Sequence, residues 1–150
     1  MPTKILVIHG PNLNLLGKRK RSVYGRATLA EINRAIERAA RKEQVGVEFY
    51  QSNHEGELVE KLQESEGRYG AVVLNPAGFT HTSVALHDAV EAIRTPVVEV
   101  HLSNIQAREP FRHRSFISPV AEGVIYGFGM ESYLLGLKGA IALARKRKTR

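Results

Sequence analysis

The sequence contains no cysteine among its 150 residues, which excludes disulfide bonds, thiolate metal sites and a cysteine nucleophile. It contains no tryptophan, and its aromatic content of 7% is low for a protein that stacks nucleic-acid bases. No hydrophobic run approaches the length of a membrane span, and the first residues lack a signal-peptide pattern. We therefore expect a cytoplasmic protein without a membrane anchor.

The remaining composition is that of a globular protein with excess positive charge. Hydrophobic residues make up 43% of the chain, and its length suits one domain, residues 1–150, with a substantial core. The net charge of +7 favours anionic partners: nucleic acid, acidic membranes or small carboxylated metabolites. Part of this charge lies in residues 145–150, which we interpret as a helix end that frays into a solvated tail.

Five short hydrophobic runs alternate with segments of helical periodicity. The predicted strands are residues 4–9, 45–51, 71–75, 97–101 and 123–126, and the predicted helices are residues 28–43, 55–67, 82–94 and 130–146. Thr28 with Glu31, and Ser52 with Glu55, match the capping box that begins a helix. The alternation predicts an α/β fold, a five-stranded parallel sheet with helices on both faces, for which a flavodoxin-like strand order is the natural arrangement.

The segment after the first predicted strand, residues 10–25, is neither a regular helix nor a strand. It combines Asn12, four consecutive cations from Lys18 to Arg21, and Tyr24. A phenol ordinarily loses its proton near pH 10, so a tyrosine that acts as a base needs a nearby positive charge. Arg19 can supply it. The alternative is that this segment is only a solvated, mobile surface loop.

Polar residues follow every predicted strand, and the carboxyl ends of parallel strands share one edge of the sheet. The residues expected at that edge are amides, histidines, arginines and a tyrosine: Asn12, Arg19, Tyr24, Asn53, His54, Asn75, His81, His101, Asn104, Arg108 and Arg112. Three histidines at successive strand ends, interleaved with amides, indicate a polar ligand site.

The pattern argues against three common kinds of site. Gly17 and Lys18 are followed by arginine instead of serine or threonine, so they do not form a P-loop. The sequence has no Gly-x-Ser-x-Gly nucleophile elbow. The histidines share no helix face, and we expect no metal. Glu99 instead lies on the same strand face as His101 and is suited to orient its ring.

What remains is proton transfer on a polyhydroxylated acid. Arg112 is suited to hold a carboxylate through two hydrogen bonds, and Asn12 and Asn75 to hold hydroxyls or an oxyanion. Tyr24 and His101 are then the base and the acid. Two other functions stay open: a domain that senses an anion without converting it, and a nucleic-acid-binding domain that uses the positive charge.

The motifs at the strand ends are long and independent: residues 9–17, Arg19, and residues 23–25, 51–57, 75–83, 88–89, 100–104 and 111–113. Together they resemble those of type II 3-dehydroquinate dehydratases over essentially the whole chain. The resemblance implies a flavodoxin-like subunit of a homododecamer, a tetramer of trimers, without metal or cofactor. The implied reaction is the trans-dehydration of 3-dehydroquinate to 3-dehydroshikimate through an enolate, in the shikimate pathway of aromatic amino acid biosynthesis or in quinate catabolism.

The resemblance also implies residue roles. Tyr24 would remove the proton next to the ketone, with Arg19 favouring its phenolate form, and Asn12 would orient a water against the enolate oxygen. His101 would protonate the departing hydroxyl, with Glu99 holding its ring. The substrate would be bound by Asn75, His81, Leu102, Ser103, Arg112 and, from a neighbouring subunit, Asp88.

Three positions depart from the family pattern. Within residues 18–22 the family commonly has Glu-Pro, where this chain has Lys20 and Arg21. Loss of the fixed proline φ and gain of two cations predict a lid that is more mobile when empty and closes on an anionic ligand. His87 stands where arginine is frequent, which changes the surroundings of the trimer contact expected for Asp88.

Overall fold

The architecture is a five-stranded parallel sheet, described from a computed structural model that places residues 3–148. The strands are β1 (Lys4–His9), β2 (Gly46–Gln51), β3 (Ala71–Asn75), β4 (Val97–His101) and β5 (Gly123–Tyr126). Their spatial order is β2-β1-β3-β4-β5, and every neighbouring pair is parallel. This is the flavodoxin-like order, so the predicted fold class is confirmed.

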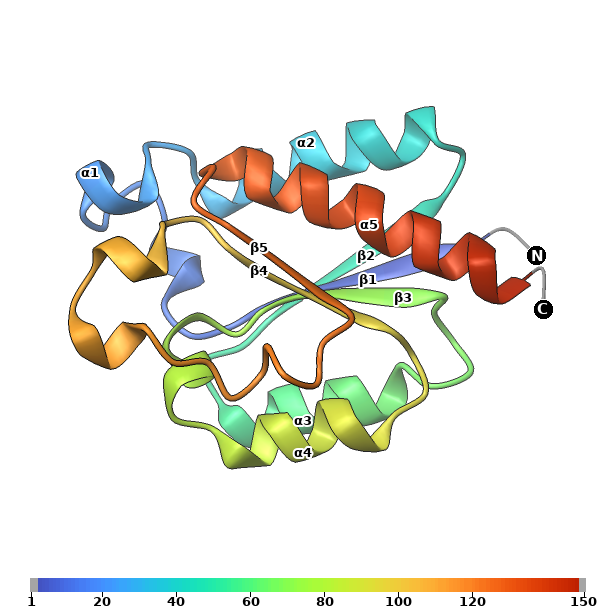
Figure 1. Cartoon of the computed structure of the whole chain (residues 1–150). Helices are drawn as coiled ribbons and strands as arrows, with labels where there is room; N and C mark the ends of the chain where they lie inside the picture. Colours follow the sequence, from blue (N-terminus) through green and yellow to red (C-terminus); the bar gives the residue numbers. More distant parts are fainter. Residues whose placement is uncertain (1–2, 149–150) are drawn as a thin grey trace.

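Helices cover both faces of the sheet (Figure 1). Helices α2 (Leu29–Lys42) and α5 (Met130–Lys148) lie on one face, and α3 (Glu55–Glu64) and α4 (Val84–Ala92) lie on the other. The loops beyond the carboxyl ends of the strands gather at the opposite end of the molecule from the start of β1 and the end of α5. These loops contain the short helix α1 (Arg21–Tyr24) and 3-10 turns at Leu13–Leu15, Ala77–His81, Ile105–Ala107 and Pro110–Arg112.

The sheet is buried on both sides because alternate residues of each strand face opposite helix layers. In β1, Ile5 and Val7 pack in the core beneath α2 and α5, whereas Leu6 and Ile8 pack in the core beneath α3 and α4. All four are fully buried, which explains why the strand is a continuous hydrophobic run. Gly136 lets α5 approach the sheet, since a β-carbon there would lie 2.4 Å from a valine methyl of β4.

Capping at the helix starts agrees with one of the two predicted capping boxes. The Thr28 side chain accepts a hydrogen bond from the Glu31 backbone N–H at the start of α2, as predicted. The second prediction is wrong, because His54 is the N-cap of α3. Ser52 accepts from the His54 backbone N–H and donates to Glu57 at 2.5 Å, so it braces the turn before the helix.

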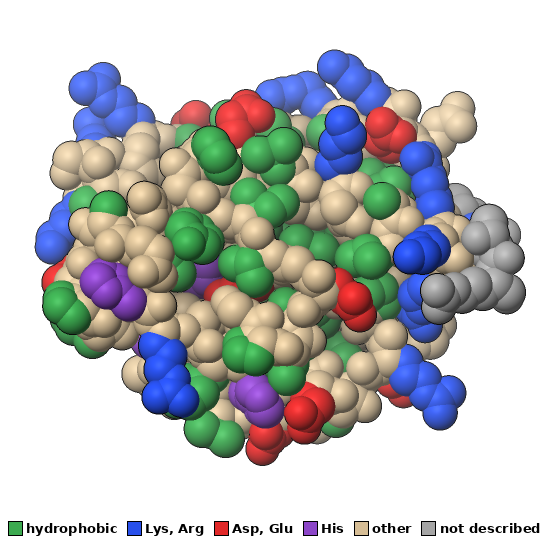
Figure 2. All heavy atoms as spheres, viewed as in Figure 1, with side chains coloured by type: hydrophobic (Ala, Val, Ile, Leu, Met, Phe, Trp, Pro, Cys, Tyr) green, Lys and Arg blue, Asp and Glu red, His purple; other side chains and the backbone are tan. Residues whose placement is uncertain are grey.

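The basic end of the chain is more regular than predicted. Helix α5 continues to Lys148, and residues 149–150 of the predicted tail lie outside the described residues. Arg145 pairs with the Glu43 carboxylate at 3.1 Å, which ties α5 to the end of α2. On the face shown in Figure 2, lysine and arginine side chains project separately around the rim. Between residues 3 and 148 no helix is both long and apolar enough to span a membrane.

Candidate active site

A cavity of about 130 Å³ lies beyond the carboxyl ends of β1, β3 and β4. The strand order reverses between β1 and β3, and α/β proteins bind ligands at such a point. All predicted site residues except Glu99 and Asp88 line this cavity. Its lining is Pro11, Asn12, Leu13, Arg19, Tyr24, Asn75, Ala77, Gly78, His81, His101, Leu102, Ser103, Ile105, Arg108 and Arg112.

Three polar residues expected at the shared edge do not line the cavity: Asn53, His54 and Asn104. His54 is the N-cap of α3, which follows the edge strand β2, and Asn104 caps a 3-10 turn through its side chain. The predicted convergence of three histidines is therefore wrong. Only His81 and His101 reach the cavity, because the strands that carry their loops are central in the sheet.

His101, at the end of β4, is held by a buried carboxylate. Its Nε2 lies 2.5 Å from Oε2 of Glu99, and Glu99 also accepts hydrogen bonds from the hydroxyls of Thr80, Ser115 and Ser118. Burial raises the pKa of Glu99, but the hydrogen bonds from His101, Ser118 and Thr80 outweigh it and lower the pKa. The carboxylate is therefore ionised and locks the imidazole in one orientation.

Tyr24 is held by two guanidinium groups. Arg19 Nη2 donates a hydrogen bond of 3.1 Å to the Tyr24 hydroxyl, and its Cζ lies 4.3 Å from the centre of the ring. Arg108 Cζ lies 5.0 Å from the same ring centre. Two guanidinium groups therefore lie against this tyrosine, one of them also bonded to its hydroxyl. Tyr24 ends helix α1, a short helix that the sequence did not predict and that Arg21 braces by donating to the Gly17 carbonyl.

The loop of Asn12 is pinned against β3 by a close backbone approach. Gly10 donates to the Asn75 carbonyl at 2.8 Å, and a β-carbon on Gly10 would lie 2.7 Å from the Pro76 carbonyl oxygen, so only glycine fits. Asn12 has a φ of 70°, in the left-handed region that asparagine tolerates. Its backbone N–H donates to Oδ1 of Asn53 at 2.9 Å. Asn53 thus supports the site without lining it.

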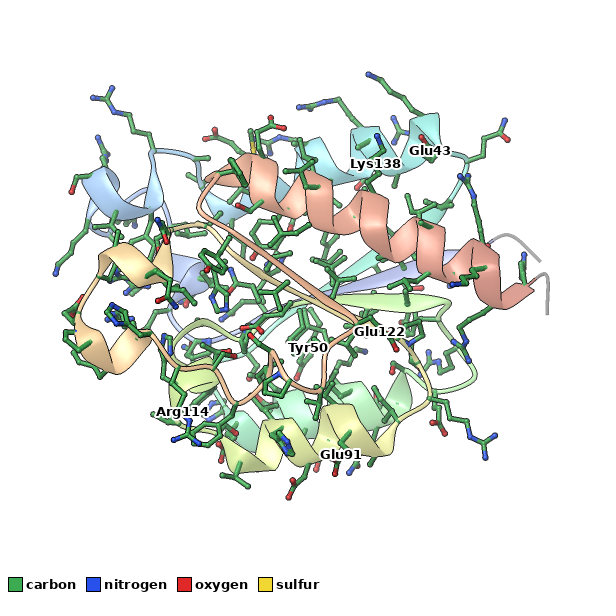
Figure 3. The ribbon with its side chains drawn as sticks, viewed as in Figure 1. Glu43, Tyr50, Glu91, Arg114, Glu122 and Lys138 are labelled. Atoms are coloured by element: carbon green, nitrogen blue, oxygen red, sulfur yellow. The ribbon has the colours of Figure 1, made fainter. Side chains whose placement is uncertain are left out.

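His81 and Arg112 present polar atoms from neighbouring turns. His81 Nδ1 lies 2.7 Å from the carbonyl of Arg114, which Figure 3 shows beside the start of α4. Burial lowers the pKa of His81, so its ring is neutral with Nδ1–H as the donor, and Nε2 is an acceptor. Arg112 donates through Nε to Glu109 at 3.3 Å, which leaves its terminal nitrogens for a carboxylate.

Asp88 lies on the exposed surface of α4 and does not line the cavity of its own chain. Its carboxylate lies 2.9 Å from Nδ1 of His87. Among residues 3–148, three side chains of metal-binding type come within 4.8 Å of one another only at His87, Asp88 and Glu91, outside the cavity. The substrate-binding role that the resemblance implies for Asp88 would therefore require a neighbouring subunit.

Four residues near the reacting groups received no role from the sequence: Thr80, Arg108, Ser115 and Ser118. Thr80 lies within the matching segment 75–83, and Arg108 was expected at the edge, so each carried a weak signal. The two serines lie in an irregular loop, where no spacing relates them to a buried carboxylate of a distant strand.

A larger groove, of about 600 Å³, lies between α2 and α5, and Figure 3 shows Glu43 and Lys138 beside it. Its lining is mostly apolar and includes neither histidine nor tyrosine. The smaller cavity is lined by two histidines and a tyrosine, which are residue types that enzymes use for proton transfer. The smaller cavity is the better candidate for chemistry.

The strand order is that of an α/β protein of flavodoxin-like topology, and its cavity brings tyrosine, histidine and arginine side chains together at the carboxyl ends of the strands. Residues 3–141 match the family model described as dehydroquinase class II. The chain belongs to the class II dehydroquinase family. The resemblance seen in its motifs is thereby confirmed.

Similar proteins cover nearly the whole chain. The 3-dehydroquinate dehydratase of a Nostoc species is 57% identical over 141 residues, which are 94% of this chain and 96% of that protein. The protein of the same name from Desulforudis audaxviator is 55% identical over 145 residues, 97% of each chain. The type II dehydroquinase structure from Butyrivibrio crossotus has a TM-score of 0.91 at 39% identity, covering 93% of this chain and 97% of that one. The Propionibacterium acnes structure has a TM-score of 0.89 at 36% identity, covering 97% and 98%.

Proposed function

We propose that this chain, as one catalytic domain over residues 1–150, dehydrates 3-dehydroquinate to 3-dehydroshikimate, a hydro-lyase reaction of the shikimate pathway. Family membership supports the reaction. The observation that carries the residue assignment is a single cavity lined by Tyr24, beneath two arginines, and by His101, backed by Glu99. A domain that only senses an anion needs no such acid–base pair, and nucleic-acid binding has no comparable observation in its favour.

In the first step, the Tyr24 phenolate removes the proton from the carbon next to the ketone. The electron pair of that C–H bond moves onto the ketone oxygen and gives an enolate. Arg19 and Arg108 stabilise the phenolate before transfer, and their charge also favours the anionic transition state. Asn12 orients a water molecule toward the enolate oxygen from a loop that Asn53 supports.

In the second step, the enolate electrons return and expel the hydroxyl of the adjacent carbon as water. His101 supplies the proton. Because its Nε2 is bound to Glu99, the nitrogen that donates is Nδ1, and the carboxylate stabilises the imidazolium that precedes transfer. The product is a conjugated enone. Tyr24 then returns its proton to solvent and His101 regains one, so no metal or cofactor enters the cycle.

The remaining lining residues bind the substrate. Arg112 takes the carboxylate through its two terminal nitrogens. Hydroxyl oxygens are bound by Asn75, His81, Ser103 and the backbone of Leu102, all of which line the cavity.

The test is the growth of enone absorbance when purified protein meets 3-dehydroquinate. We expect turnover by the wild type before and after treatment with a chelator, and loss of turnover with retained substrate binding in Tyr24→Phe. Tyr50→Phe is the matched control, because Tyr50 lies on the α3 side of the sheet, outside the cavity (Figure 3). Near-full activity of Tyr24→Phe would show that another group is the base, and an inactive, folded wild type would reinstate the anion-sensing function.

We further propose that the cytoplasmic enzyme is a homododecamer, a tetramer of trimers, in which Asp88 completes a neighbouring cavity. The exposure of Asp88 on α4, away from its own cavity, supports this. Mixed oligomers of Asp88→Asn and Tyr24→Phe, each inactive alone, should regain activity, because some cavities then combine an intact Tyr24 with an intact Asp88. Glu91→Gln, one turn further along α4, should keep full activity alone. Mixed oligomers without regained activity would contradict the shared site.

A further inference from the structure

A chain of four hydrogen-bonded polar side chains runs from the surface of α2 to the catalytic cavity. Asn33 Oδ1 lies 2.8 Å from His9 Nε2, His9 Nδ1 lies 2.7 Å from the Tyr133 hydroxyl, and that hydroxyl accepts from Nδ2 of Asn75 at 3.1 Å. His9, Tyr133 and Asn75 are at most 2% exposed. Only Asn75, the last member, lines the cavity, so the mechanism above assigns the other three no task.

The donor and the acceptor of each hydrogen bond in this series follow from the contacts of Asn75, the residue at the cavity. The backbone N–H of Ala77 can only donate, and it lies 3.0 Å from Asn75, so the atom facing it is the amide oxygen Oδ1. The amide nitrogen Nδ2 must then face Tyr133, where it donates. The Tyr133 hydroxyl therefore donates onward to His9 Nδ1, which is unprotonated, and His9 donates through Nε2–H to Asn33.

The surroundings of His9 keep its ring in the neutral form that this order needs. Burial lowers the pKa of His9 to about 4. The ring lies parallel to that of Phe49, with 6.3 Å between ring centres, and meets Tyr133 edge-on at 5.2 Å. A proton on Nδ1 would point at a hydroxyl that already accepts from Asn75, and the Tyr133 hydrogen would lose its acceptor.

We propose that His9 and Tyr133 are positioning residues that hold the Asn75 amide so that it offers the cavity an N–H donor. Its oxygen is engaged by Ala77, a cavity residue with a φ of 52° that this hydrogen bond helps to hold. One hydrogen of Nδ2 is engaged by Tyr133, and only the second remains for a ligand. The ligand atom selected here is consequently an oxygen that accepts a hydrogen bond. The inference rests on the proposed contact between Asn75 and the substrate.

The test is a kinetic double-mutant cycle on the full-length enzyme with 3-dehydroquinate. Tyr133→Phe removes one hydroxyl and keeps the buried ring, and we expect it to raise KM about tenfold with kcat nearly unchanged. Asn75→Ala should raise KM at least as much. If Tyr133 acts through Asn75, the double variant should resemble Asn75→Ala alone, whereas independent effects multiply. Tyr69→Phe, which removes a hydroxyl bonded to Glu48 far from the cavity, is the control and should leave KM unchanged.

The outcomes separate the inference from the proposed function, because wild-type turnover tests the reaction itself. An unchanged KM in Asn75→Ala would overturn both the substrate contact of Asn75 and the positioning role, while the dehydratase activity stands. Multiplicative effects of Asn75→Ala and Tyr133→Phe would overturn the positioning role alone. If Tyr133→Phe does not fold, Asn33→Ala at the partly exposed end gives the same test, with a smaller rise in KM that disappears in the Asn75→Ala background.

Discussion

The two groups proposed to exchange protons with the substrate reach the same cavity but are held in different ways. His101 ends a central strand, is buried, and is bonded to a carboxylate that three hydroxyls also hold. Tyr24 is half-buried at the end of the four-residue helix α1, where it contacts Arg19 and Arg108. The strand-end half of the site is thus fixed by the core, while the loop half depends on a short segment between β1 and α2.

This difference matters for catalysis because a preorganised group needs no rearrangement when the substrate binds. The proposed acid is held in place before the ligand arrives, whereas the proposed base and Arg19 lie in the segment between β1 and α2 that must admit the ligand. We therefore expect changes in the strand-end half to alter kcat and stability. Changes in the loop other than at Tyr24 and Arg19 should act mainly on KM.

The largest effect should come from removing the acid. His101→Asn should lower kcat about a thousandfold, within the range for general acid catalysis. The base remains intact, so the variant should still exchange the proton next to the ketone with deuterium from solvent, measured by NMR of 3-dehydroquinate. Tyr24→Phe should lose both exchange and dehydration. Loss of exchange in His101→Asn would contradict a stepwise enolate route and the separation of the two halves.

The next effect concerns the buried ring of His9 and appears as a dependence of stability on pH. Burial lowers its pKa from 6.5 to about 4, so the unfolded chain binds a proton that the folded chain does not. The neutral ring of His9 contributes about 3 kcal/mol to the free energy of unfolding above pH 6.5, and this contribution is lost as the pH falls to 4. Urea unfolding at fixed protein concentration should show this extra loss in wild type relative to His9→Phe. The exposed His54→Gln should behave like wild type, and an identical pH dependence in His9→Phe would contradict the assignment.

A smaller effect is expected from neutralising the carboxylate behind the acid. Glu99→Gln keeps the side-chain shape but loses an acceptor, so one buried donor stays unsatisfied and the free energy of unfolding at pH 7 should fall by about 2 kcal/mol. The kcat should fall about a hundredfold, since the imidazolium loses its partner. Because the folded pKa of Glu99 is lowered, its stabilising contribution is complete above the ordinary value of 4.5 and is lost below it. The difference between wild type and variant should therefore shrink in acid, and a constant difference would contradict an ionised Glu99.

The smallest effect tests the loop half. Replacing Lys20 and Arg21 together by the Glu-Pro pair frequent in the family puts proline at the first position of α1, which suits a helix start. Restricting the open loop should outweigh the lost hydrogen bond from Arg21 to the Gly17 carbonyl and lower KM about two- to fivefold at unchanged kcat. The KM should also become less sensitive to salt, because two cations are lost. Lys18→Ala is a control for charge alone, and an equal change in that variant would argue against the stiffening.

The bounds of the strands were easier to predict than the side-chain contacts of the loops that follow them. The bounds of β1, β3, β4 and β5 agree with the sequence prediction, because hydrophobic runs and their flanking turns are local signals. Helix α3 ends at Glu64, earlier than expected, since the Ser65 hydroxyl bonds the Leu62 carbonyl and a left-handed Gly67 follows. Glu99 was linked to His101 through strand alternation alone. The hydroxyls around Glu99 and the contact between Arg108 and Tyr24 arise from tertiary packing, for which one sequence carries no periodic signal.

The strand order also determines when the active site appears during folding. The cavity combines residues as distant as Asn12 and Arg112, and it exists only after β1, β3 and β4 have paired in parallel. Such pairing joins segments far apart in the chain and is slow, because long loops must close before any contact rewards them. Helical circular dichroism should return early in refolding and dehydratase activity late. For this enzyme, recovered activity thus shows that the parallel strands have paired in their native order. Collapsed intermediates that are rich in helix should be inactive.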